Sequence, residues 1–114
     1  MISDAAVEAF VIDTTGHVEL ETASFLRPAR PEFERAVCEM LPKLRYAPLL
    51  VGGAKRRALL IQTHVFVGQG GVDSAAVSAA SALHSKAEEE FASTPIATTV
   101  SKLDGLPHCD SFKY

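Results

Sequence analysis

The hydrophobic and polar positions at the start of the chain predict a β-hairpin. Residues 5–12 are mostly apolar and rich in β-favouring side chains, which is typical of a well-buried strand. Residues 17–23, HVELETA, alternate between apolar and charged side chains, as a half-exposed antiparallel strand does. Asp13 to Gly16 lies between them and has turn chemistry, because aspartate bonds nearby backbone and glycine accepts a positive φ.

The pattern then changes to helical spacing. Pro31 suits the first position of a helix, where its missing N–H costs nothing, and acidic residues follow in the first turn. Pro42 cannot continue the backbone hydrogen bonds, so we expect the helix to end or kink there. One apolar stripe runs along the helix, formed by Phe33, Val37, Met40 and Leu41.

The longest strand pattern comes next, at residues 57–67. We expect residues 44–53 to form a loop anchored by Tyr46 and Pro48, with Gly52 and Gly53 free to turn into this strand. The order β-β-α-β predicts an α+β fold, a three-stranded antiparallel sheet with one helix packed on a face. One face of the last strand holds Leu59, Ile61, Thr63, Val65 and Val67, and the other holds Leu60, Gln62, His64 and Phe66.

The remainder of the chain has a weaker pattern. The glycines at 68–71 interrupt it, and Asp73 or Ser74 can cap a following Ala-rich helix over residues 74–92. We expect this helix to be weak and loosely docked, and residues 96–100 to be able to form a short strand. The chain is therefore divided into a domain at residues 5–67 and, at 68–114, a linker, a weak helix and a tail of unknown role, together a C-terminal Ala-rich helical tail.

Composition fits one globular domain of 114 residues, with 47% hydrophobic and 22% charged side chains. Eight basic residues face three acidic ones between Arg27 and Arg57, whereas the chain after Val67 carries three basic and six acidic residues. A basic middle attracts phosphates or acidic peptides. We do not expect nucleic-acid binding, because no aromatic side chains interleave with the basic cluster at residues 55–57.

No cofactor, metal site or catalytic residue is expected. Cys38 lies beside the apolar helix stripe, which favours a half-buried free thiol. The run His108-Cys109-Asp110 offers too few ligands of definable spacing for a metal site. The chain shows neither a signal peptide nor an apolar run long enough for a transmembrane helix.

Residues 7–67 resemble the C-terminal domain of TonB, the energy transducer of outer-membrane transport. Phe33-Glu34-x-Ala36-Val37 followed by Arg45-Tyr46-x-Pro48 and a glycine is the most specific part of the resemblance. An apolar strand that ends in the Asp13–Gly16 turn and a last strand that ends Val65-Phe66-Val67 complete it.

The resemblance implies a periplasmic domain without catalytic activity, whose parent protein is anchored in the inner membrane. In that family an extended peptide of an outer-membrane receptor adds as a strand to an exposed sheet edge. By position, this edge is the last strand, which makes the peptide-binding residues Leu59, Leu60, Ile61, Gln62, Thr63, His64 and Val65.

The chain also departs from the family. It has no anchor or Pro-rich spacer, and no short helical segment before the first strand. It carries a long tail, which would block the predicted edge if a tail strand paired there.

Two other functions stay open on the sequence. Gly68–Gly71 follows a strand and precedes a helix, so with the basic cluster it could form a phosphate or nucleotide site, although no Gly-Lys-Ser/Thr follows. An unpaired edge also permits a homodimer, which would make the chain a dimerisation module. His64 is either a sheet-surface histidine or a peptide contact.

Overall fold

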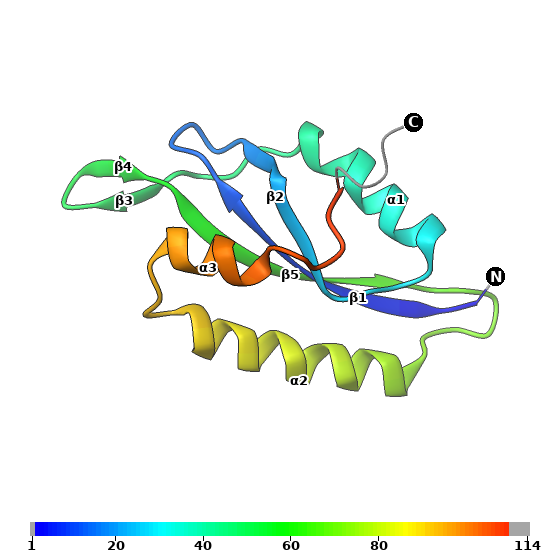
Figure 1. Cartoon of the computed structure of the whole chain (residues 1–114). Coiled ribbons are helices and arrows are strands. Elements are labelled where there is room, and N and C mark those ends of the chain that lie inside the picture. Colours follow the sequence, from blue (N-terminus) through cyan, green and yellow to red (C-terminus); the bar gives the residue numbers. More distant parts are fainter. Residues whose placement is uncertain (1, 110–114) are drawn as a thin grey trace.

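The computed structural model describes residues 2–109 and has an α+β fold. Its main sheet contains β1 (Asp4–Ile12), β2 (Val18–Arg27) and β5 (Ala58–Phe66), all antiparallel, in the order β2-β1-β5 (Figure 1). The first and last predicted strands are confirmed to within one residue at each end, and the second extends to Arg27. The central position of β1 explains its composition, because every residue from Ala5 to Ile12 is buried.

The predicted turn joins β1 to β2 and also contacts the loop after the first helix. Asp13 Oδ1 accepts hydrogen bonds from the backbone N–H of Thr15 and His17, at 2.8 and 3.0 Å. Gly16 has a φ of 87°, and its carbonyl accepts a hydrogen bond from the N–H of Tyr46 at 2.9 Å. A Cβ on Gly16 would lie 1.9 Å from the Tyr46 carbonyl oxygen, so only glycine fits this approach.

The helix α1 (Pro31–Met40) covers one face of the sheet and begins and ends as predicted. Pro31 is its first residue, and a short 3-10 helix at Leu41–Lys43 replaces α-helical geometry where Pro42 cannot donate a hydrogen bond. Phe33, Val37 and Leu41 of the predicted stripe are buried, whereas Met40 is 39% exposed. The helix packs on one side of β1, in a core formed by Ala6, Phe10, Ile12, Ala23, Phe25, Val37, Cys38, Leu41 and Cys109.

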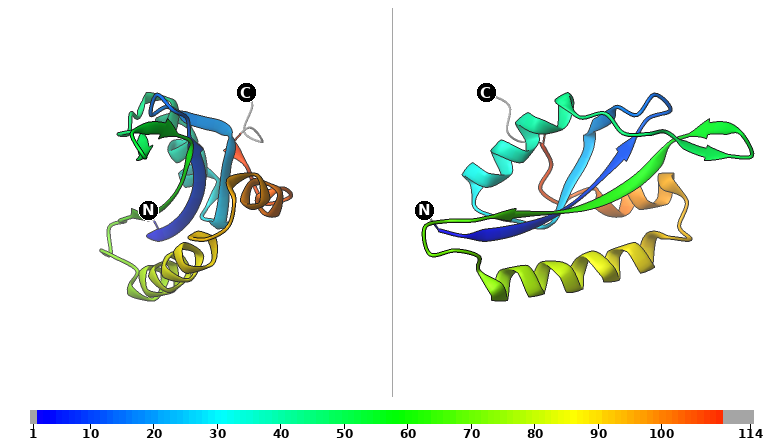
Figure 2. Two further views of the ribbon diagram at one scale, coloured as in Figure 1. Left: turned by 90° about the vertical axis from the view of Figure 1, so that its left-hand side faces the viewer. Right: turned by 180° about the vertical axis from the view of Figure 1, so that it is seen from behind.

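A second helix, α2 (Ser74–Phe91), covers the opposite face, so the sheet lies between two helical layers (Figure 2). Asp73 caps it by accepting a hydrogen bond from the N–H of Ala76 at 3.1 Å. Ala76 and Ala80 pack against Ala5 and Val7, two of the residues of β1 that point away from α1. Short alanine side chains let the helix axis approach the sheet closely, and this packing holds the helix although glutamates lie near its C-terminus.

The expected C-terminal tail, and a sheet with one helix only, are therefore not confirmed. Residues 2–109 contain three α-helices, and α3 (Ile96–Leu103) occupies the segment where residues 96–100 favoured a short strand. That strand prediction is wrong. Thr98, Thr99 and Val100 are β-branched, but Ile96, Val100 and Leu103 recur at helical spacing, and Leu103 is buried.

A small second sheet is also present where the sequence pattern favoured a loop. β3 (Leu49–Val51) and β4 (Ala54–Arg56) pair as a hairpin around Gly52 and Gly53. Both glycines have positive φ, 58° and 82°, which matches the twist of a two-residue hairpin turn. The Gly-Gly step between LLV and AKR is the signal for this hairpin.

Candidate functional site

β5 forms one edge of the main sheet and pairs only with β1 among the described residues. Its nine residues are all at least partly exposed, and their register with β1 has no bulge. The strand ALLIQTHVF contains no charged residue, proline or glycine. Proteins usually protect an open edge with charges, prolines, bulges or a covering segment. β5 itself has no charged residue, proline or bulge.

The opposite edge, formed by β2, is protected in several ways. Its pairing with β1 shifts register twice, and the strand carries Glu19, Glu21 and Arg27. The C-terminal segment also lies along it, because the Phe25 N–H donates a hydrogen bond to the Pro107 carbonyl at 2.9 Å. Ser24 and His108 form a β-bridge beside that bond. The described part of the tail therefore covers β2, at the edge away from β5.

All seven residues predicted for the binding edge lie on β5, from Leu59 to Val65. Figure 2 shows β5 from behind, running between α1 and α2 with no element of the ribbon across it. Pairing with β1 fixes the faces: His64 lies opposite Ala6 on the α1 side, and Thr63 lies opposite Val7 on the α2 side. An open groove flanks the strand on each side.

The α1-side groove is mostly apolar. Its walls come from the exposed edge of the first helix and the end of β5, and the Phe66 ring stacks on Phe33 with 4.4 Å between ring centroids. The groove measures about 350 Å³. It is lined by Ala36, Val37, Met40, Thr63, His64, Val65 and Phe66.

The α2-side groove has a polar middle. Thr63 Oγ1 lies 2.8 Å from Nδ1 of His84, so a hydrogen bond connects the edge strand to α2. His84 Nε2 in turn lies 3.4 Å from a carboxylate oxygen of Glu88, one helical turn further on. Ser81 and Ser85 complete this wall.

A buried carboxylate lies under the edge. Glu8, in the middle of β1, is fully buried, and its Oε1 lies 3.1 Å from Nε2 of His64. Burial raises the pKa of Glu8 above its usual 4.5, and the hydrogen bond and charge of His64 oppose that rise only in part. The sequence reasoning missed Glu8, although a lone acid within an otherwise apolar strand is the signal that finds it.

The cysteines correct another expectation. Cys38 and Cys109 form a disulfide, 71 residues apart in sequence, so the prediction of a free Cys38 thiol is wrong. The chain after α3 passes over β2 and reaches the buried side of α1, where the two cysteines meet. Their spacing in the sequence does not reveal that they come together. Glu8 and both sulfur atoms lie within 4.8 Å of one another. Metal ions bind the thiolate form of cysteine. In this oxidised state the two sulfurs are bonded to each other, so neither is a thiolate.

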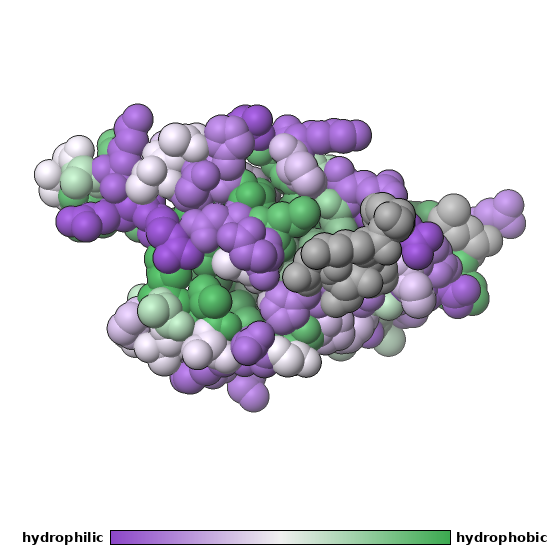
Figure 3. Space-filling view, turned by 45° about the horizontal axis from the view of Figure 1, so that its top comes forward, coloured by the Kyte–Doolittle hydropathy of each residue, from purple (hydrophilic) through white to green (hydrophobic). Residues whose placement is uncertain are grey.

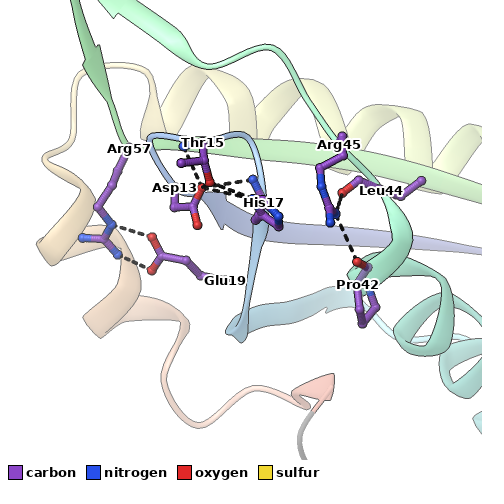
Figure 4. A network of polar contacts seen from close by, with 8 residues as sticks. All are labelled: Asp13, Thr15, His17, Glu19, Pro42, Leu44, Arg45 and Arg57. Carbon is purple, nitrogen blue, oxygen red and sulfur yellow. Dashed lines mark hydrogen bonds and ion pairs between the residues drawn. The ribbon is translucent and has the colours of Figure 1, made fainter.

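The basic cluster and the glycine loop do not form one site. Arg57 makes a bidentate ion pair with Glu19, with both N–O distances 2.7 Å (Figure 4). Gly68–Gly71 follows the other end of β5, and the Gly68 N–H donates a hydrogen bond to the Ser3 hydroxyl. The structure therefore separates the two parts of the predicted phosphate site by the length of a nine-residue strand.

Within residues 2–109, none of the helices combines the length and apolar character of a membrane-spanning segment. Comparison of the chain with protein-family models, with curated proteins and with solved structures found no match. The functional argument therefore depends on the open edge and its surroundings.

Proposed function

We propose that this domain binds an extended peptide, which adds as a fourth strand beside β5. The observation that carries the proposal is the contrast between the two sheet edges. β2 is irregular, charged and covered by the C-terminal segment, whereas β5 is regular, uncharged and, among residues 2–109, paired on one side only. An added strand takes up the unpaired N–H and C=O groups of such an edge, and main-chain hydrogen bonds supply much of the affinity.

A single added strand and a second copy of the chain would need different amounts of room beside β5. A strand needs about 4.8 Å beside its neighbour, whereas two packed helices need roughly 8–10 Å between their axes. Because α2 packs on both β1 and β5, a second copy would bring its own α2 close to this helix. A peptide meets no such requirement, and its alternate side chains enter the grooves on the two faces.

The resemblance to the TonB C-terminal domain gives the proposal its partner and location. On that basis the peptide belongs to an outer-membrane receptor, the domain works in the periplasm, and its parent protein is anchored in the inner membrane. Such a domain transmits force through its grip on the peptide and makes no covalent chemistry. This part of the proposal depends on the motifs at Phe33–Val37 and Arg45–Pro48, since no match to known proteins supports it.

Titration of isotope-labelled protein with two sets of peptides tests both parts. The first set contains N-terminal segments of outer-membrane receptors, and the second contains peptides selected from a random library on the immobilised protein. We expect peptides of both sets to shift backbone amide signals from Leu59 to Val65. Binding of library peptides alone would keep strand addition and reject the receptor as partner. No shift along this strand at millimolar concentration of any peptide would reject the proposed function.

A further inference from the structure

The α2 side of the open edge has two chemically different halves. Near the β3–β4 hairpin it becomes an apolar groove of about 550 Å³, where the start of β5 meets the end of α2 and the start of α3. Figure 3 shows apolar surface gathered in the hollow beneath the hairpin. The apolar residues that line the groove are Leu49, Ala58, Leu59, Leu60, Ile61, Phe91, Ala92 and Ile96. Arg57, Glu88 and Thr94 also line it.

The polar half lies further along the same strand. Ile61 lines both halves, so they form one continuous path beside β5. The polar half offers hydroxyls of Thr63, Ser81 and Ser85 and the imidazole of His84. The carboxylate of Glu88, which lies beside His84, would repel a negatively charged side chain of the peptide. A neutral hydroxyl or amide side chain therefore matches this half best.

We infer that the bound peptide carries a large apolar side chain and a neutral polar side chain four residues apart. The inference depends on the proposed strand addition at β5. In an added strand, residues two and four positions apart point to the same face. Leu59 marks the apolar half and Thr63 the polar half, and four residues separate them on the α2 side of β5. The peptide side chains that face these two positions have the same separation in either strand direction.

The apolar half is the anchor. Its lining comes from four elements, β3, β5, α2 and α3, which together would shield a leucine or phenylalanine side chain from water. Full burial of such a side chain strengthens binding by roughly ten- to a hundredfold. The polar half selects rather than anchors, since Thr63 and His84 already bond to each other.

Peptides that differ only in these two positions test the inference. The reference peptide has a phenylalanine and a serine four residues apart in an otherwise alternating threonine and lysine sequence. We expect replacement of the phenylalanine by alanine to weaken binding at least about tenfold. Moving the serine by one residue places it on the opposite face, and changing it to aspartate adds repulsion by Glu88. Each change should weaken binding severalfold.

Protein variants assign the effect to the groove. Phe91→Ala should reduce the preference for the phenylalanine peptide over the alanine peptide towards one, and Ile96→Ala provides a second variant of the same wall. Met40→Ala, on the α1 side, is the matched control and should keep the preference. If the peptides shift β5 amides but show no preference that Phe91→Ala or Ile96→Ala removes, this inference is wrong and strand addition stands. If no peptide shifts β5 amides, the proposed function itself fails.

Discussion

Nε2 of His64 lies 3.1 Å from Oε1 of Glu8, which connects the open edge strand to a fully buried carboxylate on the central strand. Oε2 of the same carboxylate lies 3.6 Å from Sγ of Cys109. Glu8 therefore touches both the edge proposed to bind a peptide and the disulfide that holds the end of the described chain. An isolated ionised carboxylate would be costly in this position, so its protonation should influence stability.

Replacing Glu8 should change how stability depends on pH. Because burial raises the pKa of Glu8 in the folded protein, the folded state holds the proton to higher pH than the unfolded state does. Stability from this group is complete below the usual pKa of 4.5 and is lost as pH rises through the raised value. We expect Glu8→Gln to remove this loss. The free energy of unfolding of the variant, relative to that of the original protein, should therefore rise with pH by at most about 1.4 kcal/mol per pH unit. Urea unfolding of both proteins from pH 4 to 7.5 measures it, and parallel curves would contradict the prediction.

Reduction of the disulfide should destabilise the fold without changing the sheet. The bond between Cys38 and Cys109 closes a loop with a sequence separation of 71 residues. We expect reduction to lower the free energy of unfolding by about 2–4 kcal/mol. Chemical denaturation with and without a phosphine reductant measures this loss. The double variant Cys38→Ala, Cys109→Ala is the control and should not respond to the reductant, while an equal response in both proteins would show another cause.

Gly16→Ala should be more destabilising than the same change at Gly53. Both glycines have a positive φ, 87° and 82°, so alanine costs about 1–2 kcal/mol of backbone strain at either position. At Gly16 the new Cβ would also overlap the Tyr46 carbonyl oxygen, whereas nothing lies within 4 Å of a Cβ at Gly53. Thermal unfolding of the two variants compares these costs. Equal losses would mean that the contact with Tyr46 does not constrain Gly16.

A lysine on the open edge should weaken peptide binding selectively. Val65 and Val72 are both exposed, by 44% and 53%, but only Val65 lies on β5. Val65→Lys should weaken the binding of a β5-binding peptide by up to about fivefold, because a charged side chain replaces an apolar cross-strand contact. Val72→Lys should leave affinity unchanged, and both variants should keep stability within about 0.5 kcal/mol. Isothermal titration with one peptide compares them, and an equal loss in both variants would place binding elsewhere.

Local patterns in the sequence predicted most of the sheet and its first helix. The Asp13–Gly16 turn, the apolar run of β1 and the prolines that bound α1 each act over a few residues, so a single sequence reveals them. The alternation along β5 also assigned its two faces, and the structure confirms that His64 and Thr63 point to opposite sides.

Long-range relations could not be predicted in the same way. The tight packing of α2 depends on Ala76 and Ala80 meeting Ala5 and Val7, and alanine spacing alone does not identify a surface to pack on. The disulfide likewise depends on the path of the tail over β2. The β3–β4 hairpin is different, because its Gly52-Gly53 signal is local, but two glycines suit an irregular loop as well as a hairpin turn.

Strand addition at β5 is tested most directly by removing hydrogen bonds from the peptide. An added antiparallel or parallel strand points alternate N–H groups towards its neighbour, and the others away from it. Two versions of one β5-binding peptide would be N-methylated at every second residue, in opposite phases. Amide shifts from Leu59 to Val65 in labelled protein then report binding. We predict that one version loses binding while the other retains it. Equal binding by both versions would contradict strand addition at this edge.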